Sequence, residues 1–401
     1  MNDYLKIWIG SAASNLADGV TFVALPLLAA TMTDEPFKIA ALSIAYTVPR
    51  MLSVLGIGVV VDRLDRRKLL YWANFSRSTL FAGLAALVFT GTTTLIALYL
   101  VYAAMGVVET LSDSAAVAVL PQAVPASGLD RANSQITGTQ VVIDEFLGPP
   151  LGGFLFALAA FAPSLLNVLA FLLAGLAFFS MRGAYILPAP AGPGSRPTLV
   201  QQVAEGIVWS WSNPIVRTLI LIGGLASIGY MIPFSYLVLY AGDVLGLGPT
   251  GYGLLLSASA AGGVLGSLIA APVRRRIGYL YTIAAALAVG AGSFAGIAVV
   301  DNVWTVGILL AAYIAHAVVW NIMAASIRQK VTPAAMMGRV GSVGRLIGIG
   351  GLAVGAGLGG LLATWLGHRT PFAVAAGFFA LCLVLLILAS GHFKRFERDV
   401  A

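Results

Sequence analysis

Apolar residues fill long runs of this 401-residue chain, and short polar segments separate the runs. About 20 apolar residues span a bilayer as a helix, which satisfies its own backbone hydrogen bonds there. The pattern therefore predicts an all-α polytopic membrane protein with twelve transmembrane helices. The predicted spans run approximately over residues 5–29, 39–61, 69–90, 95–117, 132–158, 164–181, 216–240, 251–272, 280–300, 303–326, 340–365 and 372–390.

Composition and charge agree with this interpretation. Hydrophobic residues make up 59% of the chain and charged residues 10%, outside the range of soluble globular domains. Lysine and arginine gather on one set of predicted loops, whereas the other set holds only Lys38 and Arg369. We therefore expect both termini in the cytoplasm and the protein in the cytoplasmic (inner) membrane. The net charge of +7 then faces anionic membrane lipids and needs no nucleic-acid partner.

The sequence offers no constellation for catalysis. The three histidines, at positions 316, 368 and 392, lack metal-ligand spacing, and the single cysteine, Cys382, excludes an internal disulfide. Residues 355–360 match G-x-G-x-x-G, but no strand precedes them and they lie inside an apolar span. We expect a protein that is not an enzyme, has no metal or cofactor and is a monomer.

Two similar loops indicate an internal repeat. Residues 120–134 and 327–342 align at an offset of about half the chain, with Arg131 matching Arg339. A parallel repeat of this kind predicts two six-helix, pseudo-symmetric bundles. We place these bundles at residues 1–182 and 215–401.

A linker at residues 183–214 joins the predicted bundles. It contains a Pro/Gly-rich segment that is unable to form a helix. After it, a capping-box pattern at Thr198 opens an amphipathic run that ends at Asn213. This run predicts a short helix on the cytoplasmic membrane surface, with Trp209 and Trp211 at the lipid headgroups.

Two adjacent carboxyls, Asp144 and Glu145, lie inside an apolar run in the first half. An ionisable group within a membrane costs roughly 2.5–3.5 kcal/mol and indicates a functional site. At α-helical spacing Asp144 shares a stripe with Thr137 and Gln140, whereas Glu145 points about 100° away. Asp144 is therefore the first candidate for carrying a proton, the alternative being a fixed ion-pair partner of Arg50 or Arg77.

Other predicted spans of the first half also contain charges. Asp18 and Arg50 lie at similar depth on the first two spans, so we expect them to pair, either as a structural ion pair or in proton coupling. Glu109 and Arg77 lie in the next two spans. All of these residues, with Asp144 and Glu145, are candidates for proton coupling.

The loop at residues 58–67 fits the pattern G-x-x-x-D-R-x-x-R-R. In it Gly58 permits close helix approach, and Asp62 is suited to accept hydrogen bonds from a helix N-terminus. Its cationic cluster consists of Arg63, Arg66 and Arg67. We interpret the loop as a conformational latch, the alternative being a simple cluster of positive charge. The matching loop of the second half, residues 266–278, keeps its arginines but lacks the acid.

Aromatic and polar residues in the second half form a candidate substrate pocket. Such side chains line adaptable sites for bulky amphiphiles, although they also serve as ordinary packing. The candidates are Tyr230, Phe234, Tyr236, His316, Trp320 and Asn321.

The loop pattern, the repeat and the linker together resemble the major facilitator superfamily. Narrower features resemble its drug:proton antiporter branch, which includes macrolide and tetracycline efflux pumps and enterobactin exporters. These features are the Asp-Gly pair at Asp18, the LPQAVP…RANS run after position 119, and an antiporter-like motif at Gly148, Pro149, Gly152 and Gly153. The chain departs from the branch at Asp144, where a glycine is usual, and at Tyr102, where an arginine is common.

The resemblance implies a secondary active transporter working by alternating access. The expected activity is efflux of a hydrophobic or amphipathic small molecule, such as a drug, an antibiotic or a siderophore-like compound, in exchange for protons. Multidrug resistance would be one consequence. Two alternatives stay open: import or facilitated movement of a metabolite or lysophospholipid, and a non-transporting membrane receptor or scaffold.

Overall fold

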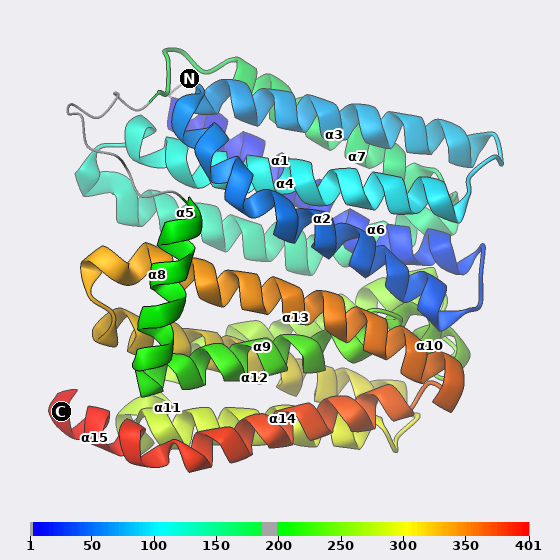
Figure 1. Ribbon diagram of the computed structural model, residues 1–401. Coiled ribbons are helices and arrows are strands. Elements are labelled where there is room, and N and C mark those ends of the chain that lie inside the picture. The colour runs from blue at the N-terminus through cyan, green and yellow to red at the C-terminus, as the bar shows by residue number, and fades with distance from the viewer. Residues whose placement is uncertain (1–2, 187–198, 401) are drawn as a thin grey trace. The chain divides into compact units, whose positions relative to one another are not determined.

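The computed structural model describes residues 3–186 and 199–400, and within them every regular element is helical. Nine helical stretches of this part are long and apolar enough to cross a membrane. One of them, α11 (Pro249–Ile297), is two helices joined at Gly278, whose φ is 80°. With α2 (Pro36–Arg63) and α3 (Arg66–Phe89), these give the twelve spans of the predicted all-α fold (Figure 1).

The remaining spans follow in chain order. They are α1 (Asp3–Ala30), α4 (Leu95–Ala123), α5 (Leu129–Gln140) continued by η2 (Val141–Leu147) and α6 (Gly148–Leu158), α7 (Ala162–Phe179), α9 (Pro214–Phe234) with α10 (Leu237–Asp243), α12 (Val303–Val331), α13 (Met337–Leu366) and α14 (Thr370–Leu388).

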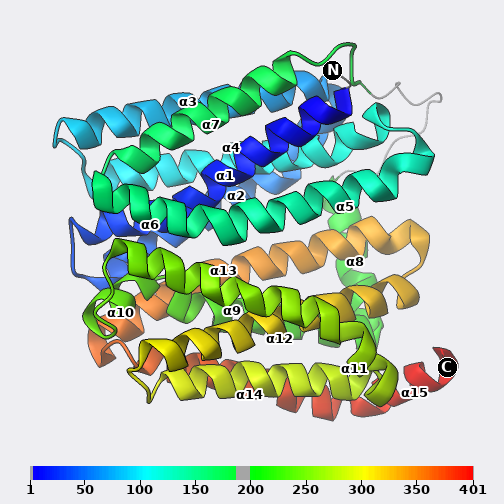
Figure 2. The same cartoon turned by 180° about the vertical axis from the view of Figure 1, so that it is seen from behind.

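The chain divides into two compact units. Unit 1 consists of the described residues within Met1–Asp34, Ala45–Pro193 and Ala241–Ser257. In it α1 packs against α4, α6, η2 and α7, so that α1 lies at the centre of the unit, as the reverse view also shows (Figure 2). This unit carries the charged residues of the site described below: Asp18 on α1, Arg50 on α2, Arg77 on α3 and Glu109 on α4.

Unit 2 consists of the described residues within Glu35–Ile44, Gly194–Tyr240 and Ala258–Ala401. Here α9 is the central helix, packed against α12, α13 and α14. The bundle boundaries expected from the sequence, 1–182 and 215–401, stay a prediction.

The two repeated loops have the same local structure. A short 3₁₀ turn follows a proline in each, η1 (Ala126–Gly128) after Pro125 and η3 (Ala334–Met336) after Pro333. In both turns the backbone N–H three residues after the proline donates to the proline carbonyl at 2.8 Å. The parallel repeat read from the sequence is thus present in the backbone.

The predicted amphipathic helix is α8 (Leu199–Ser212). The indole of Trp209 is half-buried and packs on a buried cluster that includes Val216 and Val340, and its position at the lipid headgroups stays a prediction. Trp211 is 45% exposed, which leaves its indole available to a membrane surface. Glu205 pairs with Arg339, which ties α8 to α13. Residues 187–198 of the predicted linker, including Thr198, lie outside the described residues.

Candidate functional site

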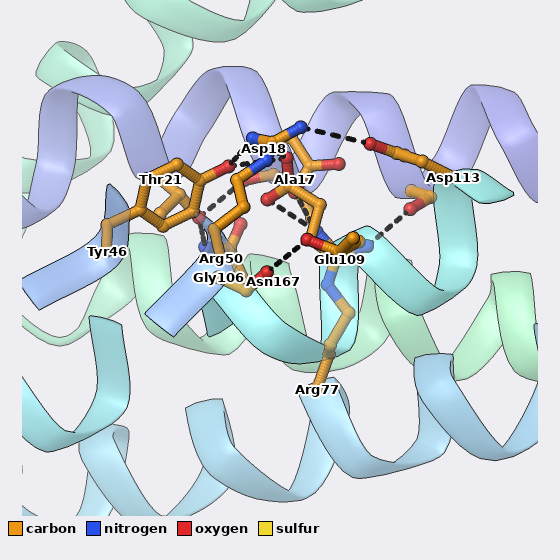
Figure 3. A network of polar contacts seen from close by, with 12 residues as sticks. Ala17, Asp18, Thr21, Tyr46, Arg50, Arg77, Gly106, Glu109, Asp113 and Asn167 are labelled. Carbon is orange, nitrogen blue, oxygen red and sulfur yellow. Dashed lines mark hydrogen bonds and ion pairs between the residues drawn. The ribbon is translucent and has the colours of Figure 1, made fainter. Parts of the chain in front are cut away.

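Arg77 is the centre of a charge network in unit 1 (Figure 3). Its side chain is 1% exposed and pairs with Asp18 of α1. It also lies 3.6 Å from a carboxylate oxygen of Glu109 on α4, and Nη1 donates to Ser14 Oγ at 2.9 Å. The guanidinium stacks over Phe171, 4.1 Å from the ring centroid. A buried cation of this kind is stable because acids, a hydroxyl and a ring replace its lost hydration.

Arg50 of α2 joins the network from the other side of Glu109. Its Nη1 lies 3.2 Å from Glu109 Oε1 and 2.5 Å from Tyr46 Oη. The Tyr46 hydroxyl donates to Glu109 Oε1 at 2.6 Å. Arg50 Nη2 reaches Asp113 at 3.4 Å, where the carboxylate is 59% exposed. Glu109 therefore links two arginines from different helices (Figure 3).

The predicted pairing of Asp18 with Arg50 is wrong. Asp18 pairs with Arg77, and Arg50 pairs with Glu109 and Asp113. Similar depth along neighbouring helices did not decide the partner, because depth carries no information on the direction in which each helix faces. Sequence reasoning also missed Tyr46 and Ser14. An aromatic residue four positions before a buried arginine, hence on the same helix face, was the available signal for Tyr46.

The segment that carries Asp144 and Glu145 is a π-helix, η2. The Gly148 backbone N–H donates to the carbonyl of Ile143, five residues earlier. The α-helical spacing assumed between Thr137, Gln140 and Asp144 is therefore wrong beyond Gln140. Single π-turns inside α-helices are rare and frequently occur at functional sites.

Asp144 is half-buried and Glu145 is exposed. The backbone carbonyl of Asp144 lies against Gly19, next to Asp18 in the chain. Asp144 is also within electrostatic range of Asp18, Glu109 and Arg77. Within the described part of the chain, no hydrogen bond or ion pair engages its carboxylate. Asp144 thus borders the network without being held by either arginine.

The glycines of the helix-5 motif permit close backbone packing. A side chain at Gly148 would strike the backbone of Gly19, and one at Gly152 would come within 2.8 Å of the Val20 carbonyl oxygen. Gly153 lies against the backbone of Pro249 at the start of α11. Pro149 is buried where η2 continues into α6, and it donates no backbone hydrogen bond to the preceding turn. The motif therefore holds η2 tightly against α1.

The predicted latch has a different arrangement from the one expected. A side chain at Gly58 would meet no described atom within 4 Å, so this glycine does not permit close helix approach as predicted. The side chain of Asp62 lies outside the described residues, and Arg63 is exposed. Arg66 is buried and donates to the Tyr185 carbonyl at 3.3 Å, while Arg67 donates to the Phe179 carbonyl at 2.5 Å.

Asp65, which the loop pattern does not specify, caps α3. Its carboxylate accepts from the backbone N–H groups of Arg67, at 3.0 Å, and Tyr185, at 3.2 Å. The N-cap rule, an aspartate directly before a helix, was the sequence signal for it. Tyr185 in turn donates to Asp3 at 2.7 Å, and burial with this bond raises the pKa of the phenol to about 12. The phenol therefore stays a neutral donor at physiological pH and ties the loop after α7 to α1.

Unit 2 contains a cavity of about 390 Å³ between α9, α12, α13 and α14. Four predicted pocket residues line it: Tyr230, His316, Trp320 and Asn321. Tyr313, Phe379 and Arg328 also line it and were missed, because an aromatic residue in an apolar span carries no sign of the face it occupies.

The other two predicted pocket residues lie elsewhere. Phe234 stacks on Tyr230 at 4.5 Å between ring centroids and supports the wall from behind. Tyr236 is fully buried and donates to the His368 carbonyl at 2.7 Å, so it is a packing residue. The ring of His316 is fixed by a 2.6 Å bond from Nδ1 to the Tyr313 carbonyl and by the edge of Phe379.

Comparison with known proteins places these features in a family. Residues 2–401 match the family described as transmembrane secretion effectors. The chain belongs to this family of major facilitator transporters.

Relatives of this chain include enterobactin exporters. The enterobactin exporter EntS of Citrobacter koseri is 27% identical over 405 residues, covering 98% of this chain and 93% of the relative. EntS of Escherichia coli O127:H6 is 26% identical over 406 residues, with the same coverage of each chain.

Solved structures share the fold of this chain. A bacterial homologue of the iron transporter ferroportin, in an inward-facing state, matches with a TM-score of 0.78 at 18% identity, covering 97% of this chain and 98% of that one. The nucleoside transporter NupG matches with a TM-score of 0.81 at 12% identity, covering 97% and 100%. These structures show the major facilitator fold, and together with the family match they make the protein a multi-pass membrane transporter.

Proposed function

We propose that this transporter exports a hydrophobic or amphipathic small molecule in exchange for protons, by alternating access with both termini in the cytoplasm. The relatives named as enterobactin exporters support export and make a siderophore-like compound the first substrate to test. Alternating access follows from the major facilitator fold, in which the two halves move about a central site.

The observation that carries proton coupling is the imbalance of charge in unit 1. Three carboxyls, Asp18, Glu109 and Asp113, share two arginines. Asp144 adds a fourth carboxyl beside them without an arginine of its own. In a medium of low dielectric constant, such an excess of acid favours binding of a proton.

Asp144 is the proposed proton carrier because a carrier must exchange its proton without breaking a bond that holds the fold. Asp18 and Glu109 are held by arginines, so neutralising either one leaves a buried cation without its partner. Asp144 is not held in this way, and its π-helix offers a backbone whose hydrogen bonds are less regular than those of an α-helix. Asp18 and Glu109 would then respond to the charge on Asp144.

In this mechanism the cavity of unit 2 contributes the substrate contacts and the loop at 58–67 acts as a latch between states. The 390 Å³ volume lies within the range of small-molecule sites, and its aromatic walls suit apolar ligands. The bonds of Arg66 and Arg67 to the loop after α7 support a switching role, since a transporter must remake such contacts in each cycle.

The test is enterobactin accumulation in proteoliposomes with an acidic lumen, with Glu145→Gln as the matched control for Asp144→Asn. Wild type should accumulate enterobactin above equilibrium, and Glu145→Gln should retain most of this activity. Asp144→Asn should bind enterobactin but show no gradient-driven accumulation. If Asp144→Asn accumulates enterobactin as well as wild type, Asp144 is not the carrier. Wild-type accumulation without a pH gradient would contradict antiport itself.

A further inference from the structure

Alanines on α12 open the space between Trp320 and Arg328 in the unit 2 cavity. These two residues are eight positions apart, about 12 Å along the helix axis, and Ala324 and Ala325 line the stretch between them. Because helical side chains tilt toward the N-terminus, the long arginine side chain reaches back toward the tryptophan. The α12 residues that line the cavity therefore run from the aromatic ring of Tyr313, past the indole of Trp320, to the guanidinium of Arg328.

The apolar part of this cavity is aromatic. The rings of Tyr230 and Tyr313 are nearly parallel, with 5° between their planes and 6.2 Å between centroids. Trp320 lines the same cavity from α12. An aromatic wall of this kind favours aromatic ligands over branched aliphatic ones, because offset and edge-to-face ring contacts add to the burial of apolar area.

Arg328 gives the cavity an uncompensated charge. Among the described residues that line the cavity, it is the one cation and no residue is acidic. It is half-buried, and none of the ion pairs in the described part of the chain includes it. The arginines of the unit 1 network are all paired with carboxylates. A partly desolvated guanidinium without an acid is complementary to an anionic ligand group, which it binds through two parallel hydrogen bonds.

We propose that the unit 2 cavity binds amphipathic aromatic anions, with the ring system beside Trp320 and the anionic group on Arg328. This inference rests on the proposed function, in which the same cavity binds substrate, and narrows the substrate class. Asn321, which also lines the cavity, supplies a neutral polar contact along the body of the ligand.

The test uses three probes that share one ring system and differ in charge: 2-naphthylacetate, 2-(2-naphthyl)ethanol and 2-(2-naphthyl)ethylammonium. Binding to the full chain in nanodiscs of zwitterionic lipid is measured by calorimetry, with empty nanodiscs subtracted and no pH gradient. Wild type should bind 2-naphthylacetate at least about tenfold more tightly than the alcohol, and the ammonium probe most weakly.

Variants separate the charge from the cavity. Arg328→Gln should remove the preference for the anion while leaving the alcohol within about threefold, and Arg328→Lys should keep part of the preference. Lys330→Gln is the matched control, since it removes an exposed cation two residues away that lies over Tyr279. Ala325→Leu should weaken all three probes by similar factors because it fills the space along α12.

Equal binding of the three probes by wild type would overturn the proposal, and so would equal loss of anion binding in Arg328→Gln and Lys330→Gln. The probe series tests wild type alone, so the proposal stays falsifiable even where a variant fails to fold. Failure of proton-driven transport with retained anion selectivity would contradict the proposed function and leave this assignment standing. Proton-driven transport without anion selectivity would support the proposed function and contradict this assignment.

Discussion

Unit 1 and unit 2 place their polar chemistry in different parts of similar helices. In unit 1 two arginines from α2 and α3 meet acids from α1 and α4 inside the membrane-spanning segments. In unit 2 the described ion pairs are Lys38–Glu35, Arg339–Glu205 and Arg369–Asp301, and all of their side chains are partly exposed. The interior of unit 2 is instead aromatic.

This difference suggests that one fold supports two tasks. Buried charge is costly and persists where it is paired or used. Aromatic side chains that line a cavity can be buried without a large desolvation cost, and they suit organic ligands. The comparison therefore supports the proposal that unit 1 handles protons and unit 2 contacts the ligand.

The largest expected effect is the loss of Arg77, the most buried member of the network. Arg77→Gln should lower the free energy of unfolding by about 3–5 kcal/mol, since Asp18 and Glu109 would lose their shared partner. Combined with Asp18→Asn it should cost less than the sum of the single changes. Denaturant unfolding of the four proteins in micelles measures this coupling, and simple additivity would contradict the pair.

A smaller effect on stability is expected from the helix caps in the two loops that follow the second helix of each repeat. In unit 1, Asp65 caps α3 from within the loop itself. In unit 2, Glu397 of α15 (Ser390–Val400) accepts from the Leu280 backbone N–H at 2.8 Å, beside the break at Gly278. The acid that the sequence lacks in the loop at 266–278 is therefore supplied from the C-terminal helix.

Glu397→Gln should lower the free energy of unfolding by about 0.3–1 kcal/mol, because the amide oxygen can still accept this bond but the negative charge at the helix N-terminus is lost. The matched control is Asp399→Asn, which removes an exposed acid from the same helix. Thermal unfolding followed by tryptophan fluorescence compares the two. Equal effects of both variants would mean that general charge on α15, and not the cap, stabilises this loop.

The sequence predicted the helices, the repeat and most of the buried charges, because apolar runs and charges inside them are visible along one chain. The sequence did not predict which charged residues pair. Asp18 pairs with Arg77 and not with Arg50, because the direction in which each side chain points depends on packing between helices. The sequence also did not predict the π-helix at Asp144. The run around it is apolar on most faces, so a wider turn causes no visible shift in the spacing of apolar residues.

The predicted latch at residues 58–67 is a second case in which the sequence did not predict a contact. A motif pattern pointed to Gly58 and Asp62, whereas the capping acid is Asp65. The pattern specifies residue types, but the cap depends on where α3 begins, which shifts by a few residues from any sequence estimate of a boundary. The sequence did not predict that Arg328 lines the cavity, since this depends on how α9 and α13 pack against α12.

The division of tasks between the units is tested most directly by measuring enterobactin exchange and gradient-driven accumulation in the same proteoliposomes. Asp144→Asn should exchange labelled for unlabelled enterobactin at near the wild-type rate but show no accumulation driven by an acidic lumen. Ala325→Leu, which fills the cavity of unit 2, should lose both activities. Accumulation by Asp144→Asn at the wild-type level, or full activity of Ala325→Leu, would contradict the assignment of protons to unit 1 and ligand to unit 2.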